Sequence, residues 1–148
     1  MNIDDINIRP ARAEEFAAIV TMLRECDLLA DDLSPESLST FHVAVDGNRL
    51  LGVCGFEGSA ADGLLRSLAV AADQRKRRLG ERLVVACEGA ARAIGIERLY
   101  LLTTSADAYL RRLGYADVAR TSVPPGIAGH PQFRGLCPAS ARCLAKKL

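Results

Sequence analysis

The stretch from Leu64 to Arg82 reads LLRSLAVAADQRKRRLGER and decides how the chain is interpreted. Its first part, Leu64 to Val70, is mostly apolar, as expected of a strand buried inside a sheet. A helix is predicted from Leu79 to Ile94, because apolar residues recur there at three- and four-residue steps and Gly95 follows as a stop signal. The segment that joins the strand to the helix is strongly basic.

Five of the eight residues from Arg75 to Arg82 are basic. The N-terminus of a helix offers unpaired backbone N–H groups and the positive end of the helix dipole, so it attracts anions, above all phosphate. Gly80 allows a ligand to approach the backbone closely. The alternative is an ordinary solvated surface, and basic residues at this end of a helix oppose its dipole. We interpret the segment as a phosphate-binding turn.

The rest of the chain alternates between strand-like and helix-like patterns, and together these predict an α/β (α+β) fold. Asp-Gly between two β-rich runs is typical of a hairpin, so the first part of the sheet should be antiparallel. The predicted elements are a strand at Ile6–Arg9, a helix at Ala13–Cys26, a turn opened by Pro35, a hairpin of Phe41–Val45 and Arg49–Phe56, a strand at Arg98–Thr103, a helix capped by Ser105 and ending at Leu113, and strands at Tyr115–Val123 and Ala141–Lys146 on either side of a loop from Pro124 to Pro138.

Length and charge limit the classes of function. The 148 residues are 49% hydrophobic and 25% charged, as expected of a single domain spanning residues 1–148. With 19 Lys and Arg against 18 Asp and Glu, the net charge is +1, too low for a protein that depends on a nucleic-acid backbone or an anionic membrane. The N-terminal residues lack a basic region followed by an apolar stretch, and we predict a cytoplasmic protein.

The metal-binding residue types are sparse and scattered. The five cysteines form no Cys-x-x-Cys pair, and neither of the two histidines has a partner at metal-binding spacing. We therefore expect reduced thiols and no metal site. His42, Cys54 and Cys87 are interpreted as core residues.

Four segments carry a resemblance to a known family. Leu68-Ala69-Val70, the turn Arg75-x-x-x-x-Gly80 leading into a helix, a strand ending at Thr103, and Ala106-x-x-Tyr-Leu-Arg-Arg-Leu-Gly-Tyr115 together resemble the GCN5-related N-acetyltransferase (GNAT) superfamily. The resemblance implies the GNAT fold, a mixed, mostly antiparallel central sheet of six to seven strands flanked by helices. It also implies acetyl-CoA as cosubstrate. The cofactor-binding residues that it implies are Leu68, Ala69, Val70, Arg75, Lys76, Arg77, Arg78, Gly80, Glu81 and Thr103.

The chain departs from the family pattern at three positions. Arg78 stands where the family turn usually has its first glycine. A bulky side chain is tolerable there if the local dihedral angles are helical and the side chain points outward, and we predict that CoA binding survives this replacement. Leu110 stands where many members have a tyrosine that protonates the leaving thiolate, and Leu64 where some have a glutamate base. Tyr109, one residue earlier, is interpreted as a core residue. The resemblance therefore assigns no general acid or base.

The catalytic candidates that remain are Arg66, Ser67 and Cys137, with Thr103 and Thr104 as further residues that would line an acceptor pocket. Arg66 would anchor an acidic group of the acceptor bidentately, or it is an exposed charge on the sheet. The simpler alternative for each of the others is structural: sheet residues, or a small buried thiol.

A closer resemblance concerns the GNAT proteins of bacterial arsenic-resistance operons. It is carried by Leu65 to Val70, Leu101 to Thr104 and the segment Phe133-x-x-Leu-Cys-Pro-Ala-Ser-Ala141. It suggests an amino acid or an arsenic-containing amino-acid analogue as acceptor, and an arsenic contact for Cys137 and Cys143. The leading hypothesis is a transferase that moves acetyl from acetyl-CoA to a small-molecule amine, in a chain that allows a homodimer.

Two alternatives to an enzyme remain open. A degenerate acyl-CoA-binding or regulatory module would account for the replaced family residues. A nucleic-acid partner for the basic turn is the weakest hypothesis, because the total charge is balanced and no aromatic residues are interleaved with the basic ones. We therefore expect neither a nucleic-acid nor a membrane partner.

Overall fold

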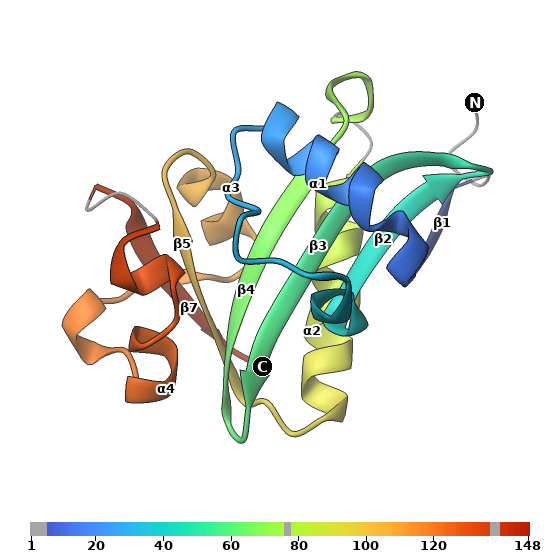
Figure 1. Cartoon of the computed structure of the whole chain (residues 1–148). Helices are drawn as coiled ribbons and strands as arrows, with labels where there is room; N and C mark the ends of the chain where they lie inside the picture. The colour runs from blue at the N-terminus through green and yellow to red at the C-terminus, as the bar shows by residue number, and fades with distance from the viewer. Residues whose placement is uncertain (1–5, 76–77, 137–139) are drawn as a thin grey trace. The chain divides into compact units, whose positions relative to one another are not determined.

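The structure is a computed structural model that describes residues 6–75, 78–136 and 140–148. Its strands form a seven-stranded sheet in the order β1-β2-β3-β4-β5-β7-β6, mixed and mostly antiparallel (Figure 1). The predicted fold class is thereby confirmed. The strands are β1 (Asn7–Pro10), β2 (Phe41–Asp46), β3 (Arg49–Ser59), β4 (Asp62–Val70), β5 (Arg98–Thr103), β6 (Ala116–Asp117) and β7 (Arg142–Lys147), and the helices are α1 (Phe16–Glu25), α2 (Leu79–Ala93), α3 (Asp107–Arg112) and α4 (Pro125–Ala128).

The predicted hairpin is confirmed. β2 and β3 pair antiparallel from Asp46↔Arg49 outward, and Gly47 in the turn has a φ of 59°, a conformation in which glycine is favoured. The prediction of a strand at Tyr115–Val123 is wrong beyond Asp117. A 3-10 turn at Arg120–Ser122 replaces it, and the Ser122 hydroxyl donates a hydrogen bond to the Ala119 carbonyl at 2.7 Å.

The predicted cap of α3 is also wrong. The N-cap residue is Ala106, and Ser105 does not cap the helix through its side chain. Instead, Thr103 Oγ1 accepts hydrogen bonds from the backbone N–H groups of Ser105 at 3.3 Å and Ala106 at 2.9 Å. Thr103, at the end of β5, therefore provides the side-chain acceptor before α3 that was predicted to be Ser105.

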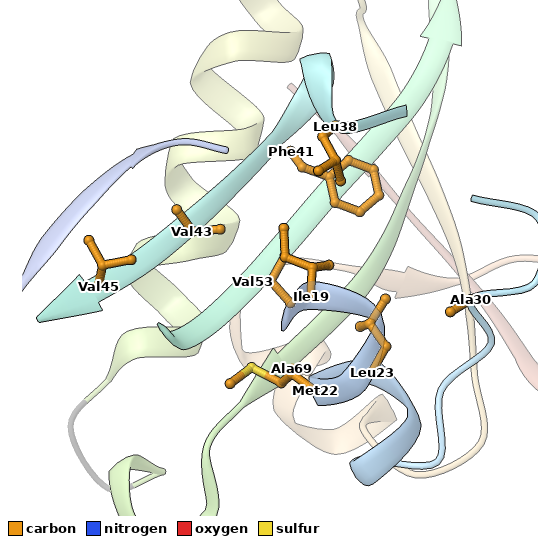
Figure 2. Close-up of a cluster of buried hydrophobic side chains, with 10 residues drawn as sticks. All are labelled: Ile19, Met22, Leu23, Ala30, Leu38, Phe41, Val43, Val45, Val53 and Ala69. Carbon is orange, nitrogen blue, oxygen red and sulfur yellow. The ribbon is translucent and has the colours of Figure 1, made fainter. Parts of the chain in front are cut away.

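The chain divides into two compact units, one made of residues up to Phe56 with Ser67–Ala90, the other of Glu57–Arg66 with Ala91–Leu148. In the first unit, α1 packs against β2 and β3. Figure 2 shows Ile19 and Leu23 of α1 directed toward Val53 of β3. All three side chains are fully buried, because successive apolar residues of α1 fall on one stripe. The buried cluster consists of Ile19, Met22, Leu23, Ala30, Leu38, Phe41, Val43, Val45, Val53 and Ala69.

The α2 helix covers the other face of these strands. Because successive strand residues point to opposite faces, Gly52 faces away from the cluster that contains Val53. A Cβ atom at Gly52 would lie 2.9 Å from Cδ1 of Leu83 on α2, so the glycine lets this helix approach the strand closely. Further along, Gly55 lies opposite Phe41, and a Cβ there would lie 2.3 Å from the Phe41 ring.

The second unit has its own core beside β5. This strand pairs parallel with the start of β4 and antiparallel with β7. Residues of α4 and of the segment before it cover one side of these strands. Among the helices of the described residues, none is long and apolar enough to cross a membrane. The buried cluster consists of Leu64, Tyr100, Val123, Ile127, Cys143 and Ala145.

Candidate functional site

The middle of β4 is irregular. Ser67 has a φ of 60°, in the left-handed region that non-glycine residues rarely adopt, and it is buried. The parallel ladder between β4 and β5 stops before this residue, with Leu64↔Tyr100 as its last pair. Such irregularities in strands re-aim side chains and interrupt pairing, and they recur beside functional sites. Ser67 was predicted as a candidate because of its hydroxyl, but its most unusual property is its backbone conformation.

The segment after β4 is held against the end of that strand. Arg75 Nε donates a hydrogen bond to the Val70 carbonyl at 3.2 Å, and Arg75 Nη2 lies 3.8 Å from Cys26 Sγ. Arg49 binds both carboxylate oxygens of Asp73, at 2.8 and 2.9 Å. The exposed Arg75 therefore has a fixed guanidinium at the strand-to-helix junction. Lys76 and Arg77, the next two predicted phosphate ligands, lie outside the described residues.

The backbone of Arg78 does not meet the helical condition under which a bulky residue is tolerable at this position. Its φ is +57°, which is left-handed. The reason is positional: Arg78 is the last residue before α2, where its carbonyl accepts the first helical hydrogen bond, from Arg82 N at 3.1 Å. The backbone changes direction at Arg78 to enter α2, and the left-handed conformation of this residue produces the change. The side chain is exposed, as expected.

The first turn of α2 is positioned to receive an anion. The helix begins at Leu79, and its first helical hydrogen bond is donated by Arg82. The N–H groups of Leu79, Gly80 and Glu81 precede that bond and have no partner within the helix, as at the start of every helix. Arg75 and Arg78 add positive charge beside them. The start of α2 is therefore the anion-attracting end of a helix, and the phosphate-binding turn stays a prediction.

A second group of polar side chains lies in the other unit. Arg66 Nη1 donates a hydrogen bond to Glu57 Oε2 at 2.8 Å, and His130 Nε2 lies 2.6 Å from the same oxygen. The side chain of Arg66 is 0% exposed, that of His130 16% and that of Glu57 33%. The interpretation of Arg66 as an exposed charge is therefore wrong: the guanidinium is buried and paired with a carboxylate from the neighbouring strand.

The hydrogen bonds of His130 define its tautomer. Its Nδ1 atom lies 3.1 Å from the backbone N–H of Gln132, which can only donate, so Nδ1 is an acceptor. Nε2 then carries the proton that is donated to Glu57. This bond, together with Arg66, holds the pKa of the Glu57 carboxyl below its usual range, although partial burial acts in the opposite direction. Glu57 is a carboxylate at neutral pH.

The sequence did not indicate Glu57 or His130. Glu57 follows an apolar strand directly, and a carboxylate there reads as the polar end of that strand. His130 lies 73 residues further along, within a loop rich in proline and glycine. The only available signal was Arg66 itself, because a buried arginine in an apolar strand requires a carboxylate partner.

A third group joins three elements of the first unit. Cys87 of α2 lies 3.8 Å from His42 Nδ1 on β2, and it hydrogen-bonds with Cys54 on β3. The Cys54 bond and the imidazole lower the pKa of the Cys87 thiol to about 6. Both sulfurs are fully buried, as expected of core residues. The described cysteines, Cys26, Cys54, Cys87 and Cys143, are all free thiols.

The remaining candidates occupy structural positions. Leu64 and Leu110 are buried, so neither brings a polar group to a site. The half-buried Tyr109 has the Arg112 guanidinium 5.8 Å from its ring centre. The hydroxyl of Thr103 is used at the start of α3, as described above, and Thr104 is exposed. Cys137 lies outside the described residues.

Comparison with known proteins places these features in a family. A family model described as "Acetyltransferase (GNAT) domain" matches residues 37–117. A search of curated proteins found no match. Among solved structures, the N-acetylglutamate synthase of Neisseria gonorrhoeae in complex with coenzyme A and L-arginine is similar with a TM-score of 0.81 and 22% identity, and 97% of this chain covers 33% of that one. The chain thus spans about a third of that enzyme.

Two further structures are matched over nearly their whole length. A protein from Mycobacterium tuberculosis in complex with CoA has a TM-score of 0.78 at 18% identity, and the match covers 96% of this chain and 99% of that one. The PaiA N-acetyltransferase of Thermoplasma acidophilum, in complex with coenzyme A, has a TM-score of 0.71 at 15% identity, with 97% and 99% covered. At these identities the likeness concerns the fold.

Proposed function

Because the chain belongs to the acetyltransferase (GNAT) domain family, we propose that it is an acetyl-CoA-dependent N-acetyltransferase that acts on the amine of a small molecule. The observation that carries the proposal is the junction of β4 and α2, where the N-terminus of a helix follows a segment of basic residues. Similar structures from other organisms hold CoA, which supports the same cosubstrate here.

The residues at this junction suit the diphosphate of CoA. The amides of Leu79, Gly80 and Glu81 would bind phosphate oxygens, and the guanidinium of Arg75 would pair with them. The resemblance to GNAT proteins implies that Leu68 and Val70 pair with the pantetheine arm through their backbones. These contacts would direct the acetyl group along β4, toward the irregularity at Ser67.

The reaction needs little covalent chemistry from the protein. The amine nitrogen attacks the thioester carbonyl, a C–N bond forms, the C–S bond breaks, and the amine proton ends on the departing thiolate to give free CoA. Holding both reactants in place can supply several kcal/mol of the rate enhancement, and backbone N–H donors along β4 would stabilise the oxyanion. The amine attacks in its neutral form, so the remaining requirement is the removal of one proton from the ammonium ion before the attack.

The acceptor is proposed as a small-molecule amine. An amino acid or an arsenic-containing analogue is a candidate acceptor. The support for these candidates comes only from the resemblance to proteins of arsenic-resistance operons. We also propose, from the sequence, a cytoplasmic location and no nucleic-acid partner.

The proposal is tested by two measurements on the purified protein. Calorimetry should show that acetyl-CoA binds, and thiol detection should show that at least one amine from a metabolite pool accelerates CoA release. Mass spectrometry of the products then identifies the acetylated amine. A protein that binds neither acetyl-CoA nor CoA would refute the proposal.

A second candidate is a CoA-binding module without turnover. It is favoured by one observation. Positions 64 and 110 hold buried leucines, where the resemblance implies a glutamate base in some members and a tyrosine acid in many. The two functions separate cleanly, because the module binds acetyl-CoA but no amine accelerates the release of CoA from it.

A further inference from the structure

We propose that Cys54 and Cys87 form an oxidation site, in which a peroxide joins the two thiols into an internal disulfide that links β3 to α2. The site lies wholly within the first unit, and it does not depend on the proposed acetyltransferase function. The disulfide would stop the oxidation of Cys87 at a stage that a thiol reductant can reverse.

The packing of α2 on β3 brings the two sulfurs together. A Cβ atom at Gly52 would lie 2.9 Å from Cδ1 of Leu83, so the helix and the strand are in close contact there. Two residues further along β3 is an advance of about 6.6 Å, and four residues further along the same face of α2 is about 6 Å. These nearly equal steps lead to Cys54 and Cys87, whose thiols hydrogen-bond with each other. Because the sulfurs already meet, a disulfide needs no large backbone movement.

Cys87 has the surroundings of a nucleophilic thiol. Its Sγ atom lies 3.8 Å from Nδ1 of His42, and His42 stands opposite Cys54 in the β2–β3 ladder. The hydrogen bond with Cys54 and the imidazole lower the pKa of the Cys87 thiol to about 6, although burial acts in the opposite direction. At pH 7 about nine tenths of this thiol is then thiolate, which is the form that attacks a peroxide.

Cys54 has the properties of the second thiol in such a reaction. Its hydrogen bond with Cys87, its burial and the negative charge of Glu88 all raise the pKa of the Cys54 thiol, so this residue keeps its proton. Glu88 follows Cys87 in α2 and is itself buried. The pair therefore consists of one thiolate and one protonated thiol in contact, and each has a different part in forming the disulfide.

The oxidation proceeds in two steps. The Cys87 thiolate attacks one oxygen of hydrogen peroxide, so that an S–O bond forms, the O–O bond breaks, and the hydroxide that leaves takes a proton from the solvent. The sulfur has then given two electrons to the peroxide and is a sulfenic acid. The Cys54 sulfur attacks the Cys87 sulfur, the S–S bond forms, and the hydroxyl group leaves with the Cys54 proton as water. In total the protein loses two hydrogen atoms and two water molecules form.

Burial of the pair determines which oxidants can react. Both sulfurs are fully buried, whereas His42, which contacts Cys87, is half-buried. The protein surface is therefore one side chain away from Cys87, and a local opening of the structure admits a molecule as small as hydrogen peroxide. The reaction should be slower than that of an exposed thiolate of the same pKa.

The experiment treats the purified full-length protein with hydrogen peroxide at neutral pH, blocks the remaining thiols, and maps disulfides by mass spectrometry without reduction. The expected product is a single chain in which the peptides of Cys54 and Cys87 are joined, and dithiothreitol should restore both thiols. Cys143→Ala removes another buried thiol, whose pKa is raised by burial, and as the control it should leave the link unchanged. Absence of the link, or overoxidised Cys87 beside a free Cys54 thiol, would overturn the proposal.

Two variants test the separate parts of the two thiols. In Cys54→Ala the sulfenic acid of Cys87 has no thiol to react with, so dimedone should label Cys87 at least about tenfold more than in the natural protein. In Cys87→Ala, dimedone should leave Cys54 unlabelled, because this thiol keeps its proton. Equal labelling of Cys87 in Cys54→Ala and the natural protein, or labelled Cys54 in Cys87→Ala, contradicts the proposal. If either variant fails to fold, the disulfide map of the natural protein still decides.

Discussion

The left-handed conformation of Arg78 predicts that replacing it with glycine stabilises the protein. A non-glycine residue with the φ of +57° seen at this position pays about 1–2 kcal/mol for placing its Cβ near the next carbonyl. Glycine avoids this cost but loses about 0.4–1 kcal/mol, because the unfolded chain gains conformational freedom. The difference leaves Arg78→Gly more stable by roughly 0.5–1 kcal/mol.

The structure supplies the control. The Arg78 side chain is exposed, and the one interaction of this residue described above is made by its backbone carbonyl. Arg78→Ala removes the charge but keeps the Cβ atom, so its stability should stay close to that of the natural protein. Arg78→Asn should fall between alanine and glycine, because asparagine tolerates the left-handed region better than most residues.

Thermal and urea unfolding of the four proteins measures the effect. A gain of 1 kcal/mol corresponds to about 2–4 °C in Tm for a chain of this size. The order glycine, asparagine, alanine in stability is the expected result. If alanine were the most stable and glycine the least, residue 78 would be right-handed in solution, and the reasoning from its backbone would be refuted. Acetyl-CoA affinity, measured on the same proteins, separates the loss of charge from the relief of strain.

Three further predictions concern the phosphate-binding turn, the Glu57 carboxyl and the buried thiols. Gly80→Leu should weaken acetyl-CoA binding at least tenfold by calorimetry; because leucine is a better helix former than glycine, loss of α2 cannot be the cause, and unchanged affinity would contradict a phosphate contact at this turn. The Glu57 carboxyl has a folded-state pKa below its unfolded value of about 4.3, so its contribution to stability is present above that pH and is lost as the pH falls through the folded-state pKa. In urea unfolding, the natural protein should therefore lose more stability than Glu57→Gln between about pH 5 and pH 3. His42→Asn should raise the pKa of the Cys87 thiol from about 6, seen as an upward shift in the ultraviolet titration of thiolate, whereas an unmoved titration would show that Cys54 alone sets it.

The elements with strong periodicity could be predicted from the sequence. The α2 helix and the β2–β3 hairpin were predicted because each has an uninterrupted pattern and a clear turn or stop signal. The strand predicted at Tyr115–Val123 failed after Asp117, because a side-chain hydrogen bond of Ser122 stabilises a turn that competes with the strand. A local pattern of apolar residues predicts which side chains are buried. It does not show where a side-chain hydrogen bond favours a turn over a strand.

The candidate site could be predicted from the sequence only where its residues follow one another along the chain. The turn from Arg75 to Gly80 is continuous in sequence, so its charge and its glycine were visible at once. The contact between Glu57 and His130 joins residues 73 positions apart, and no spacing rule reaches that far. The dihedral angle of Arg78 could not be predicted, because a sequence shows which residue replaces a glycine but not whether the backbone has changed with it.

The close contact between Gly55 and Phe41 has a consequence for how this sequence can change over time. Any side chain at residue 55 would meet the Phe41 ring at 2.3 Å, so neither position can vary freely alone. A homologue with alanine or a larger residue at position 55 should carry a smaller side chain at position 41. The two residues would then form a covarying pair across the β2–β3 hairpin, and an alignment of relatives would reveal that pairing without any coordinates.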